Sequence, residues 1–166
     1  MSDDWTETSK VQRSAAILGL GGLIPFWSLP VILLANGTLD PQRSEALLSF
    51  VALYGAIICS FMGGTRWGLA MRTPEAGPFS GLLGSVVPPL VAWAVVGAPD
   101  LGLEALDSPL VQLELIVGLL AFQLFEDWRS ATRGTLSRWY IRLRMILVAG
   151  VTAPLILALL INGLNG

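Results

Sequence analysis

The stretch "ALLSFVALYGAIICSFMGGTRW", residues 46–67, decides the fold class. It carries no charged residue before Arg66. It is therefore long enough to cross the hydrocarbon core of a bilayer, which needs about 20 predominantly apolar helical residues. The chain has four more segments of this kind: residues 14–36, 79–97, 109–125 and 145–162. The sequence predicts an all-α polytopic membrane protein, a bundle of five transmembrane helices that forms a single domain over residues 1–166.

The composition leads to the same class of protein. Hydrophobic residues make up 54% of the chain, charged residues 13%, and the mean hydropathy is +0.68. A soluble domain of 166 residues cannot hide that much apolar surface from water. The net charge of −2 gives no overall basic field for nucleic acid. The first segment follows the acidic leader "MSDDWTETSK" and lacks a clear cleavage site, so we expect it to stay in the mature protein.

The basic residues predict the orientation of the bundle. All of the 10 lysine and arginine residues except Arg43 fall before the first segment, at the end of the second segment (Arg66) or between it and the third, or between the fourth and fifth. Cytoplasmic loops carry an excess of lysine and arginine. We therefore expect a cytoplasmic N-terminus and a C-terminus on the outer, periplasmic side. Asp40–Pro41 and Ser108–Pro109 are typical helix starts, with the N-cap residue followed by proline at the first helical position.

The residues that are missing exclude several kinds of chemistry. The chain has no histidine and a single cysteine, Cys59. Haem ligated by histidine, zinc held by His and Cys clusters, and a Ser–His–Asp triad are therefore excluded. We expect no enzyme activity, no metal site and no cofactor.

Glu114 is the charged residue that interrupts an apolar segment. It lies about five residues inside the segment that begins at Pro109, and an ionisable group at such a position is a functional hypothesis by default. One interpretation is a ligand or proton site formed with Gln112 and Arg43. The other is a structural role, in which Glu114 reaches the headgroups or pairs with Arg43. We expect Gln123 to hydrogen-bond a neighbouring helix.

Small residues form two neighbouring rows along the segment 46–67, and one row continues to Gly68. One row is Ala52, Ala56, Ser60, Gly64 and Gly68, and the other is Gly55, Cys59 and Gly63. Such rows form a groove into which another helix backbone packs closely. We expect a helix of the same bundle to fill this groove, and a helix of another protein is the alternative. "GLGGLIP" and "GLLGSVVPP" predict proline kinks in the first and third helices, whose freed backbone carbonyls need partners.

Aromatic and basic residues gather at the predicted inner surface. They are Arg66, Trp67, Trp128, Arg129, Arg133, Arg138, Trp139, Tyr140, Arg142 and Arg144. Amphipathic rings prefer the membrane interface, and anionic headgroups attract basic segments. We expect contact with anionic lipids, with docking onto an acidic partner as the alternative. Glu126 and Asp127 are candidates for local pairs with Arg66 or Arg129.

A family resemblance adds to this interpretation. "LYGAIICSFMGGTRWGLAM" (53–71), "WYIRLR" (139–144), "GLGGLIPF" (19–26) and "SVVPPL" (85–90) together resemble the transmembrane protein 69 family, over nearly the whole chain. That family consists of small multi-helix inner-membrane proteins of bacteria and mitochondria. The resemblance implies a bacterial inner-membrane location, or a mitochondrial one in a eukaryote, and about five helices. It implies no activity.

Two functions are consistent with the sequence. The first is a non-catalytic integral inner-membrane protein, an accessory subunit or assembly factor that packs against a larger membrane complex. Its partners are then other integral-membrane proteins and lipids, with bound lipid expected. The alternative is a binder or transporter of small lipophilic ligands, with a cavity near Glu114.

Overall fold

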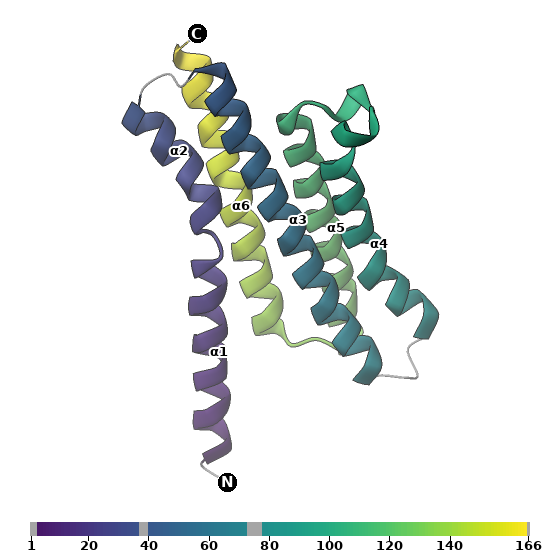
Figure 1. The fold of residues 1–166 in the computed structure, drawn as a ribbon. Helices are drawn as coiled ribbons and strands as arrows, with labels where there is room; N and C mark the ends of the chain where they lie inside the picture. Colours follow the sequence, from purple (N-terminus) through teal and green to yellow (C-terminus); the bar gives the residue numbers. More distant parts are fainter. Residues whose placement is uncertain (1–2, 37–39, 73–77, 166) are drawn as a thin grey trace.

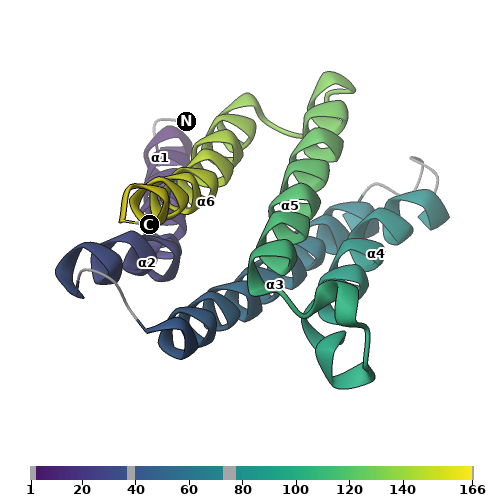
Figure 2. The same ribbon diagram turned by 90° about the horizontal axis from the view of Figure 1, so that it is seen from above.

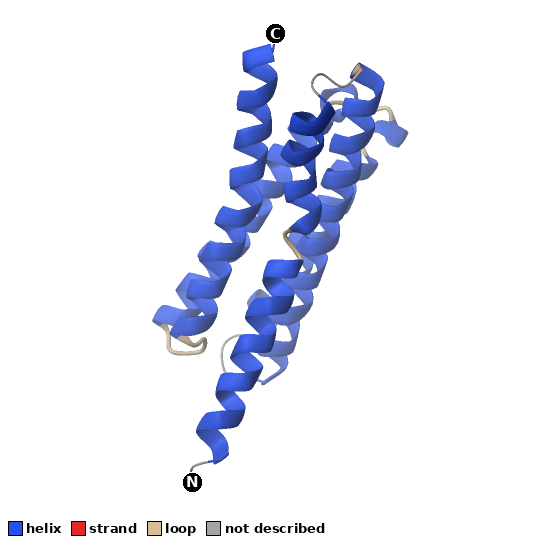
Figure 3. Ribbon diagram, turned by 90° about the vertical axis from the view of Figure 1, so that its left-hand side faces the viewer, coloured by secondary structure: helices blue, strands red, loops and turns tan. Residues whose placement is uncertain are grey.

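The computed structural model describes residues 3–36, 40–72 and 78–165, and every regular element within them is a helix (Figures 1 and 3). The α-helices are α1 (Asp3–Gly21), α2 (Ile24–Asn36), α3 (Pro41–Arg72), α4 (Pro78–Gly97), α5 (Pro109–Thr132) and α6 (Arg138–Asn165). Two short 3-10 helices, η2 (Pro99–Leu101) and η3 (Glu104–Leu106), connect α4 to α5. The prediction of an all-helical fold is confirmed.

The helices are longer than the predicted apolar segments. α3 begins before and ends after residues 46–67, and α5 and α6 likewise extend past residues 109–125 and 145–162 toward their connecting loop. Hydropathy marks only the part of a helix that matches the bilayer core, whereas backbone hydrogen bonding continues into the polar ends. At the predicted start of α3, the backbone N–H of Arg43 donates to Oδ1 of Asp40 at 3.0 Å, so Asp40 caps this helix. Ser108 stands at the N-cap of α5 with Pro109 next, but its side chain makes no capping hydrogen bond.

The predicted helix over residues 14–36 is broken into α1 and α2. The break lies at residues 22 and 23, just before Pro25, which has no N–H and whose ring crowds the preceding turn. Phe26 N–H donates to the carbonyl of Leu23 at 3.0 Å, which leaves the carbonyl of Gly22 without its usual helical donor. The hydroxyl of Tyr54, on α3, donates to this carbonyl at 3.0 Å. A neighbouring helix thus supplies the partner that the kink requires.

The helices form two groups, visible from above in Figure 2. One group contains α1, α2 and α6, with α2 packed on α6, and the other contains α3, α4 and α5, with both α4 and α5 packed on α3. Contacts of α5 with α6 and of α2 with α3 join the two groups. The buried core between them includes Phe26, Val51, Ile116 and Leu120.

The two predicted rows of small residues have different surroundings. A Cβ atom on Gly55 would lie 2.7 Å from Cγ2 of Ile116 on α5, and one on Gly63 would overlap the Ser85 carbonyl oxygen and the Pro89 ring on α4. Cys59 is fully buried between these glycines. This row therefore lies in the helix interface expected of it.

The other row does not form one continuous packing groove. Ala52 and Ala56 are buried, but Ser60, Gly64 and Gly68 are exposed, and no atom lies within 4 Å of a Cβ built on either glycine. The reason is geometric: α4 and α5 cover a single face of α3, and this row turns away from that face toward the C-terminal end of α3.

Four helical segments are long and apolar enough to cross a membrane: Ser9–Ala35, Gln42–Arg72, Pro109–Thr132 and Arg138–Ile161. α4 adds a shorter apolar stretch, Leu82–Gly97. The N- and C-termini lie at opposite ends of the bundle in Figure 1, as an odd number of crossings requires. The chain is a membrane protein built of transmembrane helices. The N-terminus, the end of α3 and the α5–α6 connection share one end, called the basic end below because of their arginines and Lys10.

Candidate functional site

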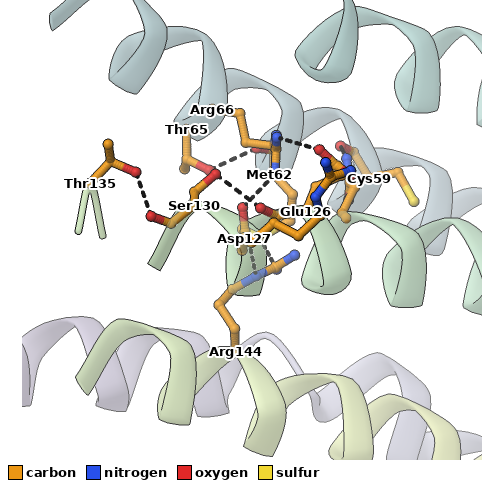
Figure 4. Close-up of polar contacts among 11 residues, drawn as sticks. Cys59, Met62, Thr65, Arg66, Glu126, Asp127, Ser130, Thr135 and Arg144 are labelled. Atoms are coloured by element: carbon orange, nitrogen blue, oxygen red, sulfur yellow. Dashed lines mark hydrogen bonds and ion pairs between the residues drawn. The ribbon is translucent and has the colours of Figure 1, made fainter. Parts of the chain in front are cut away.

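Four charged side chains from three helices meet near the basic end (Figure 4). Arg66 comes from α3, Glu126 and Asp127 from α5, and Arg144 from α6. We call these residues the ion cluster. It is the densest group of polar contacts between helices that the structure shows, and it joins the two helix groups.

Asp127 is the centre of the ion cluster. Only 2% of the residue is exposed. Its Oδ1 accepts a hydrogen bond from Nη1 of Arg66 at 2.8 Å, and its Oδ2 accepts one from Nε of Arg144 at 3.0 Å. One carboxylate thus binds two guanidinium groups.

The two arginines use their remaining nitrogens differently. Nη2 of Arg66 lies 3.7 Å from Oε2 of Glu126, which is half-buried and also pairs with the exposed Arg129 at 3.2 Å. Nη1 of Arg144 contacts Sδ of Met62, a weak acceptor. Nε of Arg66 and Nη2 of Arg144 are buried and have no hydrogen-bond partner among the described residues. The ion cluster therefore has more buried donors than acceptors.

Local structure at the end of α5 places Arg144 against Asp127. Gly134 adopts a left-handed conformation with φ of 79°, which ends the helix and turns the chain back. Thr135 Oγ1 donates to the carbonyl of Ser130 at 2.7 Å and so fixes this turn. α6 then begins at Arg138 and runs antiparallel beside α5, and Arg144 on its inward face meets Asp127.

The ion cluster corrects two of the surface predictions. Arg144 was expected at the inner surface but is 3% exposed, and the side chain of Arg66 is 12% exposed. Both guanidiniums turn inward because Asp127 offers them a buried carboxylate. The predicted pairing of Arg66 with Glu126 or Asp127, and of Arg129 with Glu126, is confirmed.

The other predicted inner-surface residues remain near the surface. Arg129, Arg133, Arg138 and Arg142 are exposed, as are Trp67 and Trp128. Trp139 and Tyr140 are partly buried and stack edge to face with ring centroids 6.2 Å apart.

Gln123 makes the interhelical hydrogen bond predicted for it. The residue is fully buried, and its Nε2 donates to the backbone carbonyl of Cys59 on α3 at 3.1 Å. Its Oε1 is buried without a partner among the described residues.

Glu114 does not make the contacts with Gln112 and Arg43 that were predicted for it. Arg43 pairs with Asp40 at 3.2 Å, within its own turn of α3, and Nε2 of Gln112 donates to the carbonyl of Leu106 at 2.8 Å. Neither contact involves Glu114, because each of these two side chains has a nearer acceptor. Instead Glu114 lines a cavity of about 230 Å³ between α2, α3, α5 and α6, called the Glu114 cavity below.

Sequence reasoning missed the burial of Asp127. The predicted segment ended at residue 125, so Asp127 was expected outside it, in a local pair with Arg66 or Arg129. A signal was present: acidic residues at the end of one apolar segment, and Arg66 and Arg144 at the matching ends of two others. In the described part of the chain, no group of three or more His, Cys, Asp or Glu side chains is placed to hold a metal ion.

Comparison with known proteins places the chain in a family. The model of a family described as "Protein of unknown function (DUF3429)" matches residues 11–160. Transmembrane protein 69 of Xenopus tropicalis is 33% identical over 129 residues, a match that covers 75% of this chain and 49% of that protein. The chain therefore spans about half the length of this curated relative. No solved structure matches the chain. The resemblance found in the sequence is confirmed, and the chain belongs to the transmembrane protein 69 (DUF3429) family.

Proposed function

We propose that this protein is a non-catalytic integral inner-membrane protein that serves as an accessory subunit or assembly factor of a larger membrane complex. The observation that carries the proposal is the basic end. Arg133 is exposed there at the end of α5, and Arg138 and Arg142 are exposed in the first turns of α6, across a turn fixed by Gly134 and Thr135. An ordered basic surface supports docking of an acidic partner, because little conformational entropy is lost on binding.

The orientation of this surface is part of the proposal. The helix ends that carry the arginines lie together, and the opposite end carries Asp100, Glu104 and Asp107 between α4 and α5. By the positive-inside rule the basic end faces the cytoplasm, or the matrix in a mitochondrion, and the C-terminus lies on the outer side.

The absence of catalysis is supported by how the buried charges are used. Asp127, Arg66 and Arg144 bind one another, so these charged groups of the described chain serve to hold helices together. A general acid or base must instead be free to reach a substrate proton.

Replacement of Arg133, Arg138 and Arg142 by glutamine tests the proposed docking surface. We expect the chain to leave its complex, so that native electrophoresis in mild detergent shows a lone protomer in place of a larger species. The matched control replaces the same residues by lysine, which keeps the charge and retains an electrostatic partner. A wild-type chain that purifies alone with bulk lipid, or a glutamine variant that keeps the complex, contradicts the proposal.

A second function is favoured by the Glu114 cavity. Its walls are mainly leucines from α2, α3, α5 and α6, and Glu114, Ser44 and Thr152 are its polar members. Pockets that bind small molecules combine apolar walls with a few polar groups in this way. We infer that its ligand is a small apolar molecule with a cationic or hydrogen-bond-donating head. Because the cavity holds about 230 Å³, such a ligand is smaller than a typical drug molecule.

Glu114→Gln tests the Glu114 cavity without a change in side-chain size. With hexylamine as the probe, we expect affinity to fall by about tenfold, because the ammonium loses its anionic partner and keeps only a hydrogen bond to a neutral amide oxygen. Calorimetry in detergent micelles measures the change. The control is Glu104→Gln, the same substitution on the exposed loop of the same end. Equal affinity in both variants contradicts ligand binding at Glu114.

A further inference from the structure

A second, larger cavity lies between the two helix groups. Its volume is about 430 Å³, and α1, α3, α5 and α6 contribute to its walls. Volumes of this size are typical of pockets that enclose a small molecule. We call it the chamber.

The chamber is apolar along most of its length and polar at one end. Its apolar walls include Leu18, Leu23, Ile58, Phe61, Leu147 and Val151. Thr65, Tyr140 and Arg144 also line it. Thr65 lies in the last turns of α3, and Tyr140 and Arg144 in the first turns of α6, so the polar residues gather at the basic end. The chamber therefore fits a molecule with an apolar chain and a polar head.

Arg144 offers the chamber an unused donor. The residue is 3% exposed, and Asp127 and Met62 occupy its Nε and Nη1. Nη2 has no partner among the described residues. Arg144 lines the chamber, and a guanidinium with an unpartnered nitrogen is suited to an anionic oxygen, because charge-assisted hydrogen bonds are the strong ones.

A groove at the basic end adjoins the chamber. Its volume is about 510 Å³, and its lining includes Arg66, Arg72 and Asp127. Thr65 and Tyr140 line both the groove and the chamber, so the two are neighbours. The buried Nε of Arg66 is also unpartnered, and Asp127 is shared between two guanidiniums. Arg66, Arg72 and Arg144 stand against Asp127 and Glu126 there, which leaves one positive charge in excess where chamber and groove meet.

We propose that the chamber and the groove together bind one anionic phospholipid. An acyl chain occupies the chamber, and the phosphate lies near Thr65 and Tyr140, within reach of Arg144 and of the groove arginines. The planar guanidinium group of arginine matches the geometry of phosphate oxygens. An anion without an acyl chain has no part that fits the apolar walls of the chamber. The proposal does not depend on the partner at the basic end, whose surface is formed by other arginines.

The test uses the full chain in nanodiscs of equal parts phosphatidylglycerol and phosphatidylcholine, with native mass spectrometry of the lipid retained. We expect one phosphatidylglycerol per chain, preferred over phosphatidylcholine by about tenfold, the effect of one charge-assisted hydrogen bond. Inorganic phosphate at the same concentration is expected not to displace it, since phosphate lacks the chain that the chamber holds. Equal retention of the two lipids, or displacement by free phosphate, overturns the proposal.

A matched pair of variants locates the lipid. Ala15 lines the chamber, whereas its neighbour Ala16 is not among the lining residues. We expect Ala15→Trp to fill the chamber and lower retention by about tenfold or more, and Ala16→Trp to leave it unchanged. Arg72→Gln changes an exposed groove residue and tests the phosphate contact in a fold that stays intact. It is expected to reduce the preference for phosphatidylglycerol. Equal retention in the two tryptophan variants, or an unchanged preference in Arg72→Gln, contradicts the site.

Discussion

Asp127→Asn is expected to lower the free energy of unfolding by about 3–5 kcal/mol, the usual effect of removing one partner of a buried ion pair. The substitution removes the carboxylate that Arg66 and Arg144 share and leaves two guanidiniums in a buried position. Asparagine has nearly the same shape, so the loss reports charge rather than packing. Unfolding in mixed micelles with increasing SDS, followed by tryptophan fluorescence, measures the change.

Glu126→Gln is the matched control for Asp127→Asn. Glu126 is the next residue on α5 and also contacts Arg66, but 26% of its side chain is exposed and its distance to that arginine is 3.7 Å. We expect a loss of at most about 1 kcal/mol, as for exposed ion pairs. If both variants lose the same stability, Asp127 is not the centre of the ion cluster.

Gly63→Ala is expected to lower the free energy of unfolding by about 1–3 kcal/mol, the usual effect of overpacking an interior. A Cβ on this residue would overlap the carbonyl oxygen of Ser85 and the ring of Pro89. Neither obstacle is a flexible side chain, so α4 must move away from α3. The same SDS titration measures the loss, and a disulfide between cysteines introduced across α3 and α4 reports the displacement.

The neighbouring glycine provides the control for Gly63→Ala. No atom lies within 4 Å of a Cβ built on Gly64. Gly64→Ala is therefore expected to raise stability slightly, by at most about 1 kcal/mol, because alanine favours the helix over glycine. A destabilised Gly64→Ala beside a neutral Gly63→Ala would show that α4 packs on a different face of α3.

The architecture could be predicted from the sequence because its causes are local. Uncharged runs such as residues 46–65 have the length that a helix needs to cross a bilayer. The arginines cluster in alternate connections, as expected when successive helices cross the membrane in opposite directions. The break between α1 and α2 was anticipated only as a kink at Pro25. How far such a kink opens depends on whether a neighbour binds the freed carbonyl, and here Tyr54 does.

The ion cluster was harder to predict because it depends on helix rotation. Arg66, Asp127 and Arg144 all stand where an apolar segment ends, and such a position is compatible with either the headgroups or the bundle interior. Local pairing of Glu126 and Asp127 with Arg66 could be predicted from their shared end of the membrane. Nothing in the spacing along the chain indicated that Arg144 faces α5 while Arg142, half a turn away, is exposed. The site residues around Glu114 were misjudged for a similar reason, since Arg43 has a nearer acceptor in Asp40.

The most direct test of the ion cluster is a double-mutant cycle between Asp127 and Arg144. Free energies of unfolding are measured for Asp127→Asn, Arg144→Met and the double variant, with Asp127→Asn and Arg142→Met as the parallel cycle. We predict a coupling between Asp127 and Arg144 at the upper end of the range of about 0.5–3 kcal/mol found for residues in contact, and additivity within about 0.5 kcal/mol for Arg142. Additive losses in the Arg144 cycle would contradict a buried carboxylate that joins α6 to α5.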